Sequence, residues 1–132
     1  MPTLKLIGTP VFASVVIPPG GTTVGTRRVF SENLREANSN QIVGQHSGTC
    51  TLVREPAFWL CHAGWTLNNV GPGAGKTGTL VAGGLLDFTS NDPVTVGIFG
   101  GTGDFDKIRG EIEAEPSVTT PNDWDYAVAY TS

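Results

Sequence analysis

The strict alternation of residues 107–115 constrains the fold of this chain most. Charged side chains occupy every second position of this segment, and apolar residues or glycine stand between them. A helix would distribute the charges around its circumference, whereas a strand places them all on one face. The segment therefore predicts a β-strand that covers a core. The same period recurs near the end of the chain, in Trp124, Tyr126, Val128 and Tyr130.

Eight segments of the chain are rich in apolar or β-branched residues and bounded by turn-forming residues. They are 4–17, 22–30, 42–53, 57–67, 78–86, 94–99, 107–115 and 124–131. The 18 glycines and 9 prolines favour short strands over helices, and only residues 31–37 have the composition of a helical turn. No βαβ spacing appears, so residues 1–132 are predicted to form one all-β domain, which suits a sandwich or a closed barrel. We expect an eight-stranded antiparallel up-and-down barrel, whose interior is wide enough for an internal ligand cavity.

The third and fourth segments predict their own register. If their turn is centred between Glu55 and Pro56, Cys50 lies opposite Cys61. A chain with two cysteines has no disulfide framework and no zinc-like spacing, so we expect two free thiols a few ångströms apart and no metal. The same register pairs His46 with Trp65 and Leu52 with Trp59 on the face of Cys50, and pairs Val53 with Phe58 and Thr49 with His62 on the opposite face.

Charge and hydropathy exclude several partners. The net charge is −4, and nucleic-acid binding needs a larger basic footprint than Arg27, Arg28 and Arg35 provide. No apolar run is long enough to cross a bilayer and no secretory signal pattern begins the chain, so we expect a cytoplasmic protein without a membrane partner. The glycine-rich run 71–77 ends like a phosphate-binding loop, but Val70 stands where its first glycine belongs. We therefore expect no nucleotide and no other cofactor.

Residues 97–111 carry a more specific signal. A glycine-dense turn that reads Gly-Gly-Thr-Gly-Asp-Phe leads there into a strand that reads Arg-Gly-Glu. This stretch resembles the signature of the allene oxide cyclase and dirigent barrel superfamily, with Ile108 where a small residue is usual. Pieces within 30–53 and 78–84 resemble segments of the same barrels, so the resemblance covers roughly the last hundred residues. It implies the barrel fold.

The resemblance also implies a chemistry. Allene oxide cyclases have a carboxylate on their first strands beside a cavity cysteine, whereas no Asp or Glu precedes Glu32 here. The chain is more similar to small bacterial cyclases of the same barrel, which fold a linear polyene or tetronate-type precursor for ring closure. We therefore expect a cofactor-free cyclase or isomerase for a small, largely apolar reactive substrate, such as a polyene, a polyketide-type or an oxylipin-like molecule. Holding such a substrate in a reactive geometry can lower its barrier by about 7 to 11 kcal/mol.

Three residues are candidates for the catalytic groups: Cys50, His46 and Glu32. They could bias charge or orient a carbonyl group of the substrate. Each also has an ordinary explanation. Cys50 could be a buried thiol of the core and His46 a structural histidine, and Glu32 could be a solvated carboxylate where a strand gives way to the turn 31–40. The predicted substrate-binding residues are Trp59, Trp65, Leu52, Cys61 and Asp87, and no metal ligand is predicted.

Two other functions stay open at this point. A non-catalytic, dirigent-like binder would hold a reactive intermediate and control its stereochemistry, and a structural barrel would have an interior filled by its own side chains. The partner would be a small apolar molecule in the first case. The barrel exterior would still carry Val53, Phe58 and Leu60, which need cover, so we expect a homodimer or a homotrimer.

Overall fold

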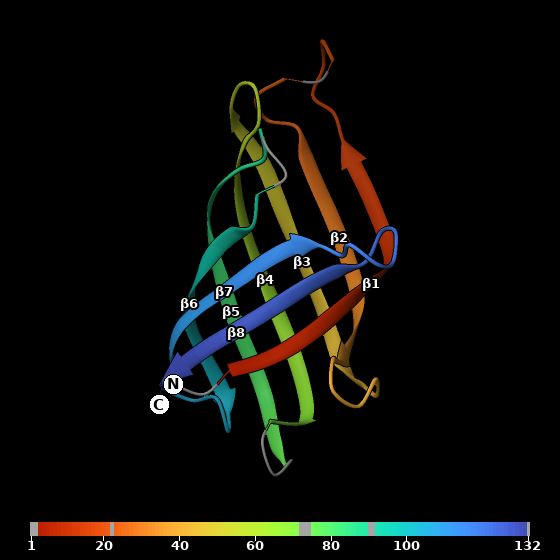
Figure 1. The fold of residues 1–132 in the computed structure, drawn as a ribbon. Helices are drawn as coiled ribbons and strands as arrows, with labels where there is room; N and C mark the ends of the chain where they lie inside the picture. The colour runs from red at the N-terminus through yellow and green to blue at the C-terminus, as the bar shows by residue number, and fades with distance from the viewer. Residues whose placement is uncertain (1–2, 22, 72–74, 90–91, 132) are drawn as a thin grey trace.

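The computed structural model describes residues 3–21, 23–71, 75–89 and 92–131, which form eight strands in one closed antiparallel sheet (Figure 1). The strands are β1 (Thr3–Val16), β2 (Arg27–Glu36), β3 (Ile42–Arg54), β4 (Phe58–Val70), β5 (Lys76–Asp87), β6 (Val94–Gly103), β7 (Arg109–Pro116) and β8 (Trp124–Thr131). Each strand pairs with the next, and β8 pairs with β1 to close the barrel. The predicted up-and-down barrel is confirmed. The described residues include no helix that could cross a membrane, and the glycine-rich run 71–77 lies partly outside them.

The course of β2 corrects two sequence-based expectations. Residues 31–36 continue the strand and do not form a helical turn, and the strand begins at Arg27. Glu32 therefore lies inside a strand and not in a turn at the barrel mouth. Glu32 and Leu34 are both buried, so the alternation is present but one of its inward positions is acidic. That acidic residue makes the segment look solvent-facing in the sequence.

The hairpin of β3 and β4 has the predicted register over most of its length. Cys50 pairs with Cys61, and His46 pairs with Trp65. The register shifts between Leu52 and Arg54, so that Arg54 lies opposite Phe58. The predicted pairing of Val53 with Phe58 is wrong, because a bulge next to the turn inserts one residue into β3.

One end of the barrel is packed with side chains. Phe105, in the connection between β6 and β7, is fully buried, and its ring meets the ring of Tyr130 edge to face at a centroid distance of 6.2 Å. A Cβ atom at Gly101 would lie 2.5 Å from the carbonyl oxygen of Phe105, so this position of the motif requires glycine. The start of β1 and the end of β8 lie at this end (Figure 1). Around Phe105 the fill consists of Leu4, Leu6, Leu34, Leu67, Val70, Leu80, Ile108 and Val128.

Candidate functional site

The opposite half of the barrel holds a cavity of about 370 Å³. Its walls come from the ends of the strands nearest the β1–β2, β3–β4, β5–β6 and β7–β8 connections. The lining is mostly apolar, and it includes all three tryptophans of the chain, Trp59, Trp65 and Trp124. The expected internal cavity is therefore present, and the alternative of a barrel filled throughout by side chains is wrong.

Three buried polar side chains form a hydrogen-bonded cluster in the cavity wall. Glu32 of β2, His46 of β3 and Tyr126 of β8 are 3%, 4% and 7% exposed. The Tyr126 hydroxyl donates to Oε1 of Glu32 at 2.5 Å, and Nδ1 of His46 lies 2.7 Å from the same oxygen. The barrel closure brings the cluster together, because β8 reaches β2 only across β1. We call Glu32, His46 and Tyr126 the acid cluster.

Aromatic rings hold His46 in place from several sides. The Trp65 ring stacks on the imidazole with centroids 3.9 Å apart and planes 11° apart, and Phe30 and Tyr126 meet it edge to face at 5.1 and 5.2 Å. Nε2 of His46 is buried and has no hydrogen-bond partner among the described residues. The imidazole lines the cavity, and its Nδ1 faces Glu32.

The environment of Tyr126 fixes its protonation state. Burial, followed by the charge of Glu32 and the hydrogen bond to it, raises the pKa of the Tyr126 hydroxyl well above its ordinary value. The hydroxyl therefore keeps its proton at ordinary pH and serves as a hydrogen-bond donor. Its role in the cluster is to hold the Glu32 carboxyl group against the wall.

A glycine on β1 makes room for the acid cluster. A Cβ atom at Gly8 would lie 2.6 Å from Oε1 of Glu32 and 2.8 Å from a ring carbon of Tyr126. Any larger residue would push these two side chains apart. Gly8 is thus part of the structural basis of the site, although it contributes no functional group.

The two cysteines correct another expectation. Cys50 and Cys61 line the cavity, as neighbours across β3 and β4, but they form a disulfide and are not free thiols. Their Cα atoms are 4.0 Å apart, and the disulfide joins the two strands directly across the pair. Cys50 therefore has no thiol to offer as a catalytic group while the disulfide is intact.

The remaining predicted substrate contacts divide into two groups. Trp59, Trp65 and Cys61 line the cavity. Leu52 is buried but does not line it, and Asp87 is exposed, with its carboxylate accepting the Thr89 backbone N–H at 2.9 Å. Hydrogen bonds from Thr89 hold the pKa of Asp87 below its ordinary value, which is a local effect of the turn.

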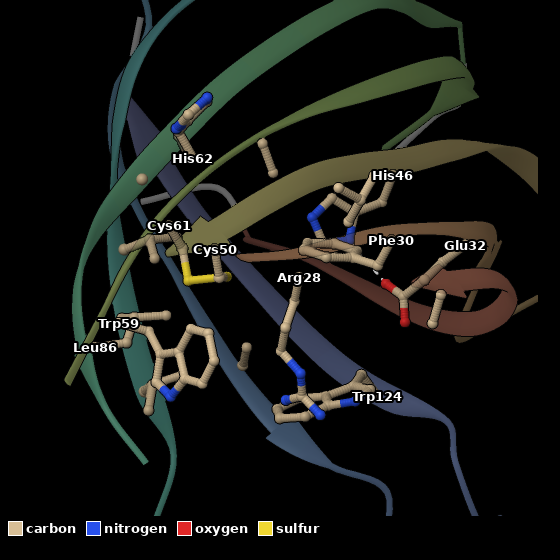
Figure 2. A pocket seen from close by; sticks show the side chains of 18 of the residues that line it. Arg28, Phe30, Glu32, His46, Cys50, Trp59, Cys61, His62, Leu86 and Trp124 are labelled. Atoms are coloured by element: carbon tan, nitrogen blue, oxygen red, sulfur yellow. Dashed lines mark hydrogen bonds and ion pairs between the residues drawn. A yellow bond between two sulfur atoms is a disulfide. The ribbon is translucent and has the colours of Figure 1, made fainter. Parts of the chain in front are cut away.

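Sequence reasoning missed Tyr126, Phe30 and Trp124 as site residues. The period of two puts Trp124 and Tyr126 on one face of the last strand, and this pattern is a sequence signal that could have identified them. Figure 2 shows Glu32, Phe30 and His46 on one side of the cavity and the disulfide with Trp59 on the other. Among the described residues, no group of three or more His, Cys, Asp or Glu side chains is arranged to hold a metal ion.

Comparison with solved structures identifies known proteins that share this barrel fold. A structure of pyocyanin demethylase matches with a TM-score of 0.78 and 23% identity, over 98% of this chain and 99% of that one. The pterocarpan synthase dirigent protein PsPTS1 matches with a TM-score of 0.71 and 19% identity, over 98% and 95%. AbnU, an exo-specific intermolecular Diels-Alderase, matches with a TM-score of 0.63 and 14% identity, over 97% and 95%.

The chain has the dirigent-type barrel fold. The resemblance seen in residues 97–111 is thereby confirmed for the fold, which is what likeness at these identities establishes. No family model matches the chain, and a sequence comparison with curated proteins finds no match either. Dirigent-type barrels with solved structures thus include proteins named for ring-forming catalysis and proteins named as dirigent.

Proposed function

We propose that this dirigent-type barrel is a cofactor-independent cyclase or isomerase that binds one small, largely apolar molecule and promotes its ring closure. The observation that carries the proposal is the acid cluster in the wall of an otherwise apolar cavity. Burying a carboxyl group costs free energy unless it is compensated, so a protein that only needed to bind an apolar molecule would gain nothing from Glu32. Diels-Alderases with the same fold support ring closure as the reaction class.

Glu32 is the group that we assign to the chemistry. A carboxyl group at this place can hydrogen-bond to a substrate carbonyl, or can take a proton from the substrate and return it to another atom during isomerisation. His46 and Tyr126 are positioning residues, because both hold Oε1 of Glu32 and neither adds a separate reactive group. The cavity wall supplies the rest by limiting the conformations of the substrate.

A non-catalytic, dirigent-like binder is the second candidate. The apolar lining and the three tryptophans favour it as much as they favour an enzyme, and the dirigent neighbours support it. The cyclase and the dirigent-like binder differ in their effect on the rate of ring closure. An enzyme accelerates ring closure, whereas a dirigent-like binder changes only the stereochemistry of a reaction that proceeds without it.

To test the proposal, the protein is incubated with a panel of linear polyenes and unsaturated carbonyl compounds that cyclise slowly without a catalyst. We expect one class to cyclise faster with the wild-type barrel, and we expect Glu32→Gln to lower the rate about a hundredfold, in the range of general acid–base catalysis, while substrate affinity changes little. Rates come from chromatography of the products, and affinities come from quenching of the tryptophan fluorescence.

Glu113→Gln is the matched control, because Glu113 is an exposed carboxylate on the outer face of β7. It should leave the rate unchanged. Altered product stereochemistry at an unaltered rate would select the dirigent-like binder. A rate that Glu32→Gln leaves at the wild-type level would remove Glu32 from the mechanism.

A further inference from the structure

Arg28 is a cationic side chain in the wall of the apolar cavity. It lies on β2 four residues before Glu32, so the period of two turns both residues and Phe30 toward the interior. Figure 2 shows the Arg28 side chain extending between Trp59 and Trp124. Its guanidinium carbon is 5.6 Å from the centre of the Trp59 ring, which places the cation over an aromatic face at the open end.

The structure gives Arg28 no acidic partner among the described residues. Arg35 forms an ion pair with Asp123, and Glu32 is hydrogen-bonded to His46 and Tyr126. Arg35 is thus engaged elsewhere, and Arg27 does not line the cavity. Of the three arginines of this segment, Arg28 alone lines the cavity, and its planar guanidinium carries five N–H donors.

We propose that Arg28 is an anion-binding subsite, and that the substrate is an amphiphile with one anionic group, such as a carboxylate, at the end of an apolar body. This inference rests on the proposed function and specifies its substrate class. The Cα atoms of residues 28 and 32 are about 13 Å apart along the strand, at about 3.3 Å per residue. A substrate anchored at Arg28 therefore lays its apolar part along Phe30 and presents its reacting atoms to Glu32.

Two matched probes test the subsite without knowledge of the substrate. Anthracene-9-propionate carries a carboxylate on an apolar aromatic body, and its primary amide has nearly the same shape without the charge. Binding of each is followed by quenching of the tryptophan fluorescence, because all three tryptophans line the cavity. We expect the wild-type barrel to bind the carboxylate about tenfold more tightly than the amide, as charge-assisted hydrogen bonds are stronger than neutral ones.

Variants assign the preference to one residue. Arg28→Gln should lower the carboxylate affinity to that of the amide and leave the amide affinity unchanged, and Arg28→Lys should retain part of the preference. Arg27→Gln removes the same charge from a neighbouring position outside the cavity lining. This variant should keep the full preference for the carboxylate over the amide. Equal binding of the two probes by the wild type, or an equal loss in Arg27→Gln, would overturn the subsite alone. Binding of neither probe would overturn the proposed function, and the subsite with it.

Discussion

The acid cluster depends on a few individual positions. Gly8 leaves the space that Oε1 of Glu32 occupies, the Tyr126 hydroxyl donates a hydrogen bond to that oxygen, and the Trp65 ring stacks on His46. Glu32 looks like a surface residue in the sequence because its neighbours Ser31 and Asn33 are polar. An inward-facing acid cannot be told from an outward-facing one by residue type, and only the closure of β8 on β1 brings its partner Tyr126 within reach.

The raised pKa of Tyr126 predicts how the stability of the protein depends on pH. A raised folded-state pKa means that the stabilisation is complete below the unfolded tyrosine pKa of about 10 and is lost as the pH rises through the folded value. We expect Tyr126→Phe to unfold more easily than wild type by about 1 to 3 kcal/mol at neutral pH, with the difference shrinking above about pH 10. Urea unfolding of both proteins at several pH values measures this difference. A difference that stays constant through strongly alkaline pH would contradict it.

At the scale of the elements, the hairpin of β3 and β4 was the most predictable part of the chain. A turn with proline fixes where the hairpin reverses, so the pairing of Cys50 with Cys61 follows by counting. The bulge beyond Leu52 does not follow, because an extra residue in one strand leaves no pattern in the residue types. Alternation and turn residues are enough to locate the eight strands. The acidic residue on the inward face of β2 is explained only by its contacts in the folded barrel.

The disulfide predicts a stabilisation of this hairpin. It links residues 11 apart in the sequence, and a loop of this size corresponds to about 3 kcal/mol in the chain-entropy model. We expect a thiol reductant to lower the urea midpoint of the wild type and to leave that of the double variant Cys50→Ala, Cys61→Ala unchanged. Thiol titration under denaturing conditions reports the starting state. Two titratable thiols in the protein before reduction would contradict the disulfide.

The whole molecule has an apolar face on its outside as well as an apolar cavity within. Leu60 of β4 pairs with Leu85 of β5, and these side chains are 51% and 62% exposed. Val81 of β5 and Phe99 of β6 continue the face, at 46% and 63% exposure. Side chains of this kind, on three adjacent strands, are typical of surfaces that bind another protein. We therefore propose that the barrel is a homodimer or a homotrimer that buries this face.

Light scattering tests the assembly. The wild type should have two or three times the 13.8 kDa mass of one chain, and Leu85→Glu should shift it toward the monomer, because a buried unpaired charge opposes association. Ile42→Glu is the control, since Ile42 is 72% exposed at the start of β3, near the packed end and away from this face. A wild-type monomer at high protein concentration would refute the proposal.

The side chains around Phe105 fill one end of the barrel, and the cavity lies in the other half. In the proposed cyclase, substrate and product would both pass through this half of the barrel, which the three tryptophans line. A product molecule that stays in the cavity would then block the next substrate molecule. Substrate could bind only after the product has left. Accumulated product would compete with substrate for an empty barrel, and turnover would slow as the reaction proceeds.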